Sequence, residues 1–331
     1  MLKIGLIGAG FMGAMHAACY ATLGIPIVAV ADVREEKCAE MAQKYGCKTY
    51  TDGESLLADA DVNVIDICLP TYQHTKYALM AMEKVPAVFI EKPVALTVEE
   101  GEALLKKQQE TGAQVMVGQV IRLWDEYVWL KEAADSGRYG KIVTGTFKRV
   151  SPRPTWGWKG WLTDPVRSGT MALDMHIHDC DFVRALCGEP KTIQTAVSRD
   201  ASGKIIHIGT AYGFGNTTIF AEGIWDYPLT FPFAMEYRVM FEKATVAAEH
   251  GTLTVYTDEG VEHPTYKREQ TGTVVEGGGN ISDLGAYYNE LKYFTDRLKA
   301  GKPIEINTLP EAVKSLKLVL KEIEMAGGGI K

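Results

Sequence analysis

An aspartate and a histidine four residues apart, Asp174 and His178, have the spacing that suits acid–base chemistry. Residues four apart lie on the same face of a helix, so the carboxylate can orient the imidazole and favour its charged form. Such a pair suits proton transfer near neutral pH. Lys92 is a second candidate, because it follows a buried apolar run and precedes Pro93, whose ring fixes φ. A lysine held there can contact a substrate, although an ordinary surface lysine explains the position equally well.

A glycine-rich turn, Gly8-Ala9-Gly10-Phe11-Met12-Gly13, follows the first apolar run of the chain. Gly8 would permit the tight turn, Gly10 would let the backbone approach a pyrophosphate, and Gly13 would allow the helix to pack closely on the strand. The helix that follows would present free N–H groups to the phosphates. The turn therefore predicts a dinucleotide site, with a purely structural βα turn as the alternative.

Two charged residues bear on which nicotinamide cofactor this turn would hold. Asp32 ends the second apolar run, about 20 residues past Gly13, where a carboxylate can bond the ribose hydroxyls of NAD. The same carboxylate would repel the 2′-phosphate of NADP, so NAD is the predicted cofactor. Arg34 could instead pair with that phosphate, so the use of both cofactors stays open.

Two more loops are predicted at the same edge of the sheet. One runs from Leu69 to His74, and the other is Glu91-Lys92-Pro93. In open α/β sheets ligands bind outside the carboxyl ends of the strands, so both loops should border the cofactor crevice. The predicted cofactor-binding residues are Gly8, Gly10, Phe11, Met12, Gly13, Asp32, Arg34, Leu69, Pro70, Thr71, His74, Glu91 and Lys92.

The first 120 residues alternate short apolar runs with longer stretches of helical spacing. This alternation predicts βαβ units around a buried parallel sheet. Thr97 and Glu100 have the spacing of a capping box at the start of one helix. The predicted strands are 4–7, 27–31, 64–69, 87–90 and 114–117, and the helices include 35–45, 75–84 and 98–111.

After about Ile121 the pattern changes to successive strands separated by Gly, Asn and Asp turns. Such a run favours an antiparallel sheet, here crossed by one helix over 171–186 and followed by helices over 281–299 and 309–325. We therefore predict an α/β protein with a doubly wound parallel domain over 1–120 and an α+β domain with a mainly antiparallel open sheet over 121–331. The last helix is expected to pack back on the first domain. The later strands are predicted at 141–150, 192–199, 205–214, 217–225, 236–242 and 253–257.

Composition excludes several classes of protein. The 331 residues carry a formal charge of -7, which argues against a nucleic-acid binder because phosphate contacts need a basic face. No apolar stretch approaches a membrane span, and Met1 is followed by no charged leader or cleavage site. The six cysteines show no metal or disulfide spacing, so a reduced cytoplasm is the expected location.

Five motifs in register resemble the glucose–fructose oxidoreductase, inositol dehydrogenase and rhizopine catabolism (Gfo/Idh/MocA) family. The resemblance covers essentially the whole chain. It implies a Rossmann domain, an antiparallel sheet domain that serves dimer or tetramer contacts, and nicotinamide-dependent oxidation or reduction of sugars and polyols. The motifs are Gly8-x-Gly10-x-x-Gly13-x-x-His16, Asp32, Pro70-x-x-x-His74, Glu91-Lys92-Pro93 and the segment 169–181, which contains Asp174 and His178.

Carried over by this resemblance, the catalytic residues are Lys92, Asp174 and His178. His178 would act as the base for a hydroxyl proton, oriented by Asp174, while Lys92 would bond the same oxygen and stabilise negative charge. The resemblance also places Gln119 near the nicotinamide and Arg122 near the substrate. Arg122 could equally form an ion pair at a domain interface.

Two further features near these residues have competing explanations. Trp156 stands in a tryptophan-rich segment, 151–161, that could cover the site and bind a carbohydrate ring, or could clasp domains or subunits. The residues Asp174, His176, His178, Asp179 and Asp181 could be a metal cluster, but His176 and His178 cannot share a helical face. We therefore predict no metal and assign His176 to packing or hydrogen bonding. In many family members a glycine occupies its position.

The predicted function is an NAD-dependent dehydrogenase, with NADP possible, acting on a secondary hydroxyl of a sugar, sugar derivative or cyclitol. The catalytic and substrate-binding residues are expected to be Lys92, Arg122, Trp156, Asp174 and His178. The alternatives are a catalytically silent NAD-binding regulator and an NAD-dependent glycosidase of the same family. The expected partners are a small carbohydrate or polyol and a second copy of the chain, in a homodimer or homotetramer formed through the C-terminal sheet.

Overall fold

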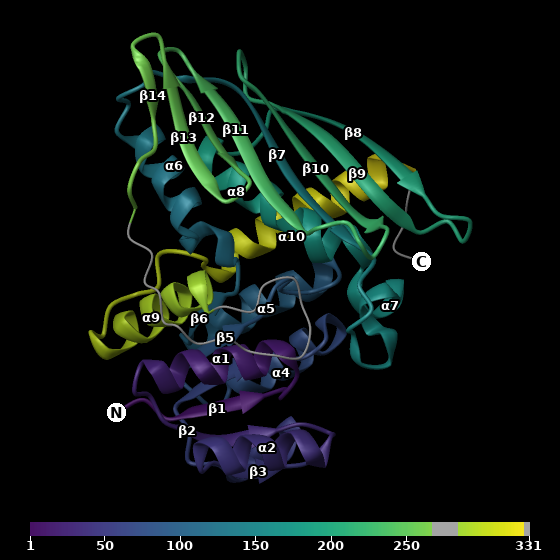
Figure 1. Cartoon of the computed structure of the whole chain (residues 1–331). Helices are drawn as coiled ribbons and strands as arrows, with labels where there is room; N and C mark the ends of the chain where they lie inside the picture. Colours follow the sequence, from purple (N-terminus) through teal and green to yellow (C-terminus); the bar gives the residue numbers. More distant parts are fainter. Residues whose placement is uncertain (267–283, 328–331) are drawn as a thin grey trace. The chain divides into compact units, whose positions relative to one another are not determined.

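The computed structural model describes residues 1–266 and 284–327, which form two compact units (Figure 1). The N-terminal unit contains residues 1–120 and 284–316, and the C-terminal unit contains residues 121–266 and 317–327. Helix α10 (Leu309–Met325) therefore begins in one unit and ends in the other. Of the predicted helix 281–299, the first three residues lie outside the described part of the chain.

The N-terminal unit is built on six parallel strands in the order β3-β2-β1-β4-β5-β6. β1, β4 and β5 are buried along their whole length, as strands covered on both faces must be. The order reverses between β1 and β4, so the loops after these two strands meet at the switch point where doubly wound sheets bind ligands. The predicted parallel sheet is confirmed. Its strands are β1 (Ile4–Ile7), β2 (Ile27–Ala31), β3 (Lys48–Tyr50), β4 (Val64–Ile67), β5 (Ala87–Ile90) and β6 (Gln114–Val117).

Helices connect these strands and complete the unit. α5 begins with the predicted capping box: Thr97 accepts from the Glu100 backbone N–H and the Glu100 side chain accepts from the Thr97 N–H. The sequence patterns do not predict β3 or α3, which are too short to show a period. The helices are α1 (Phe11–Thr22), α2 (Glu35–Tyr45), α3 (Gly53–Asp59), the 3-10 turn η1 (Thr71–Gln73), α4 (His74–Met82), α5 (Val98–Thr111) and α9 (Gly285–Lys299).

The C-terminal unit is built on eight strands in the order β14-β13-β12-β11-β7-β10-β9-β8. Only β7 and β10 pair in parallel; the other neighbours are antiparallel, so the prediction of a mainly antiparallel sheet is confirmed. The strands are β7 (Ile142–Pro152), β8 (Thr192–Arg199), β9 (Ile205–Gly213), β10 (Thr218–Tyr227), β11 (Ala234–Phe241), β12 (Thr245–Glu249), β13 (Thr252–Thr257) and β14 (Gly260–Glu262).

Side chains on the two faces of this sheet differ. On β10, Ile219 and Ala221 are buried on the face against which α8 packs, while Phe220 between them is about half exposed on the other face. The exposed face also carries Met240 and Tyr256. The helical elements are η2 (Val120–Leu123), α6 (Asp125–Asp135), η3 (Trp158–Thr163), α7 (Pro165–Ser168), the π-helical turn η4 (Ala172–His176) and α8 (Ile177–Cys187).

One helix of this part of the chain, α6, is not predicted from the sequence. α6 precedes the strands and buries Tyr127, Leu130 and Ala133, a helical spacing that the sequence analysis does not use. β12 is likewise not predicted, because its alanines give no alternating pattern. The six cysteines are free thiols. Among the described helices, none combines the length and apolar character that a bilayer crossing requires.

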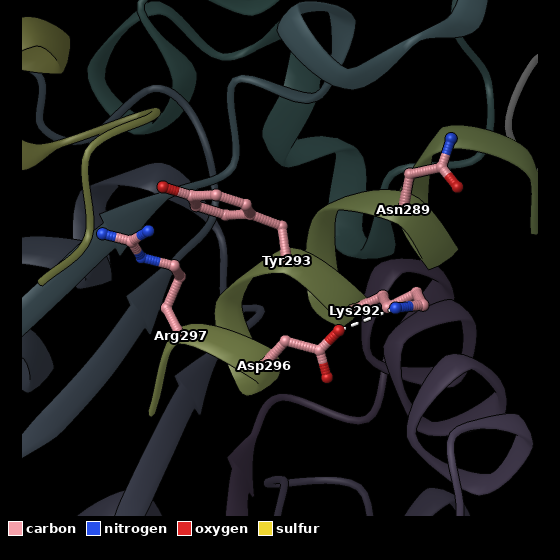
Figure 2. Close-up of a pocket in the computed structure, with 5 residues that line it drawn as sticks. All are labelled: Asn289, Lys292, Tyr293, Asp296 and Arg297. Atoms are coloured by element: carbon pink, nitrogen blue, oxygen red, sulfur yellow. Dashed lines mark hydrogen bonds and ion pairs between the residues drawn. The ribbon is translucent and has the colours of Figure 1, made fainter. Parts of the chain in front are cut away.

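A depression of about 350 Å³ lies along α9 of the N-terminal unit (Figure 2). Its lining side chains bond one another or nearby backbone: Lys292 pairs with Asp296 at 2.7 Å, and Tyr293 Oη accepts the backbone N–H groups of Glu305 and Ile306. None of the cofactor or catalytic residues predicted from the sequence lines it. We interpret it as a surface recess rather than as the site.

Candidate active site

The glycine-rich turn has the geometry that its glycines predict. Gly8 has a φ of 101°, and a Cβ there would lie 2.5 Å from the Cys68 carbonyl oxygen. A Cβ on Gly13 would lie 1.9 Å from the Gly8 carbonyl oxygen, so α1 packs directly on the turn. Gly10 precedes α1 and offers no side-chain cap, and the first turn of α1, which starts with half-buried Phe11 and Met12, contains no acid. The N–H groups at this helix start are therefore available to an anion.

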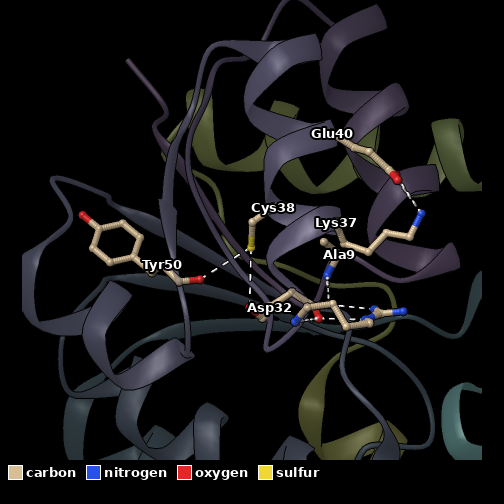
Figure 3. Close-up of polar contacts among 7 residues, drawn as sticks. Ala9, Asp32, Lys37, Cys38, Glu40 and Tyr50 are labelled. Carbon is tan, nitrogen blue, oxygen red and sulfur yellow. Dashed lines mark hydrogen bonds and ion pairs between the residues drawn. The ribbon is translucent and has the colours of Figure 1, made fainter.

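Asp32 is fixed at the end of β2 by bonds from both sides (Figure 3). Its Oδ2 accepts the Ala9 backbone N–H at 2.8 Å and Arg34 Nη2 at 2.8 Å, while its Oδ1 accepts Arg34 N and Nε at 2.9 Å. Burial alone would raise the pKa of Asp32, but the hydrogen bonds from Arg34 and Ala9 outweigh burial and lower it. Asp32 is therefore an anion at neutral pH that is tied to the glycine turn.

Cys38 holds the same strand end against its neighbour in the sheet. Its thiol donates to the carbonyl oxygens of Asp32 at 3.6 Å and Tyr50 at 3.5 Å (Figure 3). The nearby Lys37 is paired with Glu40 at 2.7 Å. Arg34 is thus bound directly to Asp32, and it is the residue that could pair with a 2′-phosphate on the nucleotide ribose.

His74 joins the two predicted cofactor loops. Its Nε2 lies 2.7 Å from the carbonyl oxygen of Leu69, and its Nδ1 lies 2.8 Å from that of Pro93. The side chain is buried, as is Thr71, while Leu69 and Pro70 are half-buried. His74 therefore fixes the distance between the loops that follow β4 and β5, and these loops carry six of the fourteen predicted cofactor residues.

Lys92 is held through the backbone by the residue before it. Its N–H donates to Glu91 Oε2 at 3.0 Å, and Glu91 Oε1 lies 3.1 Å from His16 Nε2. His16 Nδ1 in turn lies 2.9 Å from Asp66 Oδ2. Burial would lower the pKa of His16, but the Asp66 carboxylate and the Cys68 thiol beside it raise it well above its usual value. A buried imidazolium between two carboxylates therefore sets the position of Glu91, and sequence reasoning missed this role.

Gln119 is buried, and neither atom of its side-chain amide has a hydrogen-bond partner among the described residues. Its backbone carbonyl accepts from Asn307 Nδ2 at 3.0 Å, and the same Nδ2 donates to Glu290 Oε1 at 2.9 Å. Burial, together with the charge on Glu91, raises the pKa of Glu290 well above its usual value. Because buried amides are normally bonded, the Gln119 side chain has capacity for a ligand.

Asp174 and His178 lie on η4 and α8, as the spacing predicts. They are the two residues of 171–184 that are not buried. The turn before them contains Thr170 with a φ of 61°, an uncommon conformation for a β-branched residue, and η4 is a π-helical turn. Both features are frequent at functional sites. The local fold therefore turns one acid and one histidine outward from an otherwise buried segment.

Two arginines hold the acidic residues of α8. Arg122 donates from Nε and Nη2 to Asp181 at 2.6 and 2.7 Å, and Arg149 donates in the same way to Asp179 at 2.9 and 3.2 Å. The Asp179 and Asp181 side chains are fully buried, so these pairs fix the helix firmly in place. Arg122 therefore bonds within its own unit with two of its donors, while its contact with substrate stays a prediction.

The metal cluster considered for this segment does not form as a set of ligands. Asp179 and Asp181 are bound to arginines, and His176 is buried and bonded to Glu322 at 2.8 Å. His176 thus has the hydrogen-bonded role expected of it. Trp156 is about one-third exposed, between β7 and η3, and its role stays a prediction.

The residues of the N-terminal unit fit a nicotinamide dinucleotide. The glycine turn leaves room that a Cβ would fill, the α1 start offers N–H groups, Asp32 is an anchored anion, and Gln119 has an unbonded amide. Residues 2–119 match the family model described as oxidoreductase family, NAD-binding Rossmann fold, and residues 127–261 match the Gfo/Idh/MocA C-terminal domain. A myo-inositol 2-dehydrogenase of Thermotoga maritima is 31% identical over 322 residues, which cover 91% of this chain and 90% of the relative. This chain belongs to the Gfo/Idh/MocA oxidoreductase family.

Other members of the Gfo/Idh/MocA family resemble this chain over nearly its whole length. An inositol 2-dehydrogenase of Rhizobium meliloti is 29% identical over 317 residues, covering 92% of this chain and 90% of the relative. A solved oxidoreductase of Agrobacterium radiobacter, in complex with NAD+, L-tartaric acid and magnesium, superposes with a TM-score of 0.85 at 20% identity, covering 98% and 96% of the two chains. At that identity the superposition shows the fold alone. This Gfo/Idh/MocA protein thus has an NAD-binding Rossmann domain, in a family of NAD-dependent sugar and inositol dehydrogenases.

Proposed function

We propose that this chain is an NAD-dependent dehydrogenase that oxidises a secondary hydroxyl of a sugar, sugar derivative or cyclitol. The observation that carries the proposal is the outward position of Asp174 and His178 in a segment whose other residues, 171–184, are all buried. A half-buried acid–histidine pair on a buried, anchored helix is suited to proton transfer. Its family membership supports nicotinamide chemistry, because the relatives are dehydrogenases.

His178 is the proposed base. It takes the proton of the substrate hydroxyl, and Asp174 stabilises the resulting imidazolium and orients the ring. Lys92 is proposed to donate a hydrogen bond to the same oxygen and to stabilise its negative charge. A bound nicotinamide would supply the acceptor for the hydride of the carbinol carbon.

The cofactor contacts proposed for the N-terminal unit follow its geometry. The N–H groups at the start of α1 bind the pyrophosphate, and Asp32 accepts from the ribose hydroxyls. Gln119 bonds the nicotinamide carboxamide, which would satisfy its otherwise unpartnered amide. Since Arg34 already neutralises Asp32 in part, we propose that NAD is preferred while NADP is accepted weakly.

The substrate is proposed to be a cyclic polyol of the inositol kind. Two relatives that align over about nine-tenths of this chain are inositol dehydrogenases. Arg122 and Trp156 are the proposed contacts to ring hydroxyls and to a ring face. We also propose a homodimer or homotetramer formed through the sheet face that carries Phe220, Met240 and Tyr256, because this face exposes apolar side chains.

The test is a panel of inositols, sugars and sugar derivatives offered to the purified protein with NAD or NADP. We expect formation of reduced nicotinamide, fastest with a cyclitol and NAD. Lys92→Ala should lower kcat by roughly 100- to 1,000-fold while NAD affinity stays within about threefold. Tight NAD binding without turnover of any compound would overturn the proposal and favour an NAD-binding regulator. Cleavage of a glycosidic bond without net reduction of NAD would favour a glycosidase.

A further inference from the structure

A fully buried polar cluster in the C-terminal unit has no part in the proposed chemistry. The Glu322 carboxylate on α10 accepts from His176 Nε2 at 2.8 Å, Thr210 Oγ1 at 3.0 Å and Tyr212 Oη at 2.6 Å. Cys180 Sγ lies 2.8 Å from the same Tyr212 hydroxyl. Burial, with the adjoining thiol and carboxylate, raises the pKa of Tyr212 well above its usual value, so its hydroxyl remains a donor. Glu322 is therefore held by three N–H and O–H donors, and the Cys180 thiol lies 3.8 and 3.9 Å from its two carboxylate oxygens.

The distances in this cluster are those of hydrogen bonds rather than of metal ligands. His176, Cys180 and Glu322 are side-chain types that zinc can use. Two donor atoms on one tetrahedral zinc lie roughly 3.3 Å apart, given metal–ligand bonds of about 2.0–2.2 Å. His176 Nε2 and Glu322 Oε2 are only 2.8 Å apart, and Tyr212 Oη and Glu322 Oε1 are 2.6 Å apart. The cluster is thus already hydrogen-bonded internally, with His176 and two hydroxyl groups on the Glu322 carboxylate.

The hydrogen bond between His176 and Glu322 matters because of where His176 stands in its turn. His176 stands midway between Asp174 and His178, and residues two apart project from opposite sides of a helical turn. Asp174 and His178 face outward, whereas His176 is fully buried. Opposite His176, β10 has Gly223, where a Cβ would lie 3.2 Å from the His176 Cβ. η4 therefore packs closely on β10 at His176, and the His176 side chain bonds to Glu322 on the same side of the turn.

We propose that the His176–Glu322 pair is a positioning device that sets the rotation of η4 and so directs Asp174 and His178 outward. The inference rests on the proposed function of those two residues. His176 touches neither substrate nor cofactor in this proposal; it acts through the backbone that it anchors. Loss of the pair would let the π-helical turn rotate or relax toward a regular helix, which would misplace the acid and the base together.

The direct test is Glu322→Gln, which keeps the side-chain volume and removes the charge. We expect kcat for the substrate found in the panel to fall by about 10- to 100-fold, because small displacements of a base are costly. KM and NAD affinity should stay within about threefold, since the cofactor residues are in the other unit. Tyr212→Phe, which removes one of the three donors to Glu322, should lower kcat by about two- to fivefold.

Two further variants separate anchoring from general damage to the core. Cys180→Ser changes a residue of the same cluster and depth that is not in the pair, so kcat should stay within about twofold. His176→Gln retains an N–H donor toward Glu322 and should recover at least about a third of the activity that His176→Ala loses. Equal losses of kcat in Cys180→Ser and Glu322→Gln, or no recovery in His176→Gln, would overturn the proposal.

A readout without substrate keeps this test separate from that of the proposed function. The imidazole Cε1–H resonance of His178, assigned with His178→Gln, should move in Glu322→Gln and stay in place in Cys180→Ser. An unmoved resonance in a folded Glu322→Gln protein would contradict the anchor even if the enzyme is active. Stoichiometric zinc in the purified native protein would also contradict it, because the pair would then be a ligand set.

Discussion

The two units position their functional groups by different means. In the N-terminal unit the cofactor cradle is backbone: Gly8 and Gly13 allow close contacts, and the Ala9 N–H fixes Asp32. In the C-terminal unit, the segment that carries Asp174 and His178 is held by buried side-chain pairs, Arg149 with Asp179 and His176 with Glu322 among them. The glycine turn requires positions without a side chain, whereas the segment with Asp174 and His178 requires particular polar side chains around it. Substitutions should therefore separate cofactor binding from catalytic rate.

The largest effect is expected from two neighbouring glycines of the cradle. Gly13→Ala places a Cβ 1.9 Å from the Gly8 carbonyl oxygen, so we expect a loss of about 4 kcal/mol or more in the free energy of unfolding. At Gly10 the nearest atom to a Cβ is Arg34 Nη2 at 3.6 Å, so Gly10→Ala should fold with a loss below about 1 kcal/mol. It should nevertheless bind NAD about 100-fold more weakly, because the backbone approach to the pyrophosphate is blocked.

Urea unfolding and NAD titration of both glycine variants check this contrast. Normal NAD affinity in Gly10→Ala would contradict the backbone cradle, as would a normally stable Gly13→Ala.

The next effect concerns the charge pairs of the C-terminal unit. Arg149→Met leaves the Asp179 carboxylate buried without its bidentate partner, so the free energy of unfolding should fall by about 3–5 kcal/mol. The double variant Arg149→Met, Asp179→Leu removes both charges and should recover most of that loss. Chemical denaturation of the three proteins measures the difference. If the double variant is as unstable as the single one, packing rather than charge holds α8.

A smaller effect is expected on cofactor choice. Asp32→Ala should weaken NAD about tenfold and bring NADP to similar affinity, because it removes the ribose contact and the charge opposing a 2′-phosphate. Arg34→Ala should instead weaken NADP about tenfold and leave NAD within about threefold. Titration of the four protein–cofactor pairs decides this. A parallel loss of both cofactors in Asp32→Ala would show that the carboxylate does not meet the ribose.

A pH-dependent effect tests how far the N-terminal unit depends on buried charge. The pKa of Glu290 is raised in the folded state, so the folded protein retains a proton that the unfolded chain has lost above about pH 4.3. The stability that Glu290 contributes at low pH is therefore lost as the pH rises through the folded pKa. Glu290→Gln keeps the bond to Asn307 and removes this loss. Its stability relative to the native protein should grow by up to about 1.4 kcal/mol per pH unit.

Urea unfolding of native and Glu290→Gln protein between about pH 5 and pH 7 measures this slope. A constant difference over that range would show that Glu290 is ionised in the folded protein.

The difference between the units also explains what the sequence could and could not predict. The glycine turn, Asp32 and the loops after β4 and β5 were readable because each depends on residues close together in the chain. The spacing of Asp174 and His178 predicts that they share a helical face, and their catalytic role stays a prediction. The contacts of Glu91 with His16 and of Glu322 with His176 join residues 75 and 146 positions apart, and no local pattern marks such pairs. α6 was missed although its buried positions have helical spacing.

The central claim is that the backbone cradle binds the cofactor while the anchored Asp174–His178 pair transfers the proton. His178→Ala tests it most directly, with NAD affinity measured by titration and hydride transfer measured in a single turnover. We expect NAD affinity within about threefold of the native value and a rate of hydride transfer reduced by roughly 100- to 10,000-fold. A His178→Ala protein that transfers hydride at the native rate would contradict it.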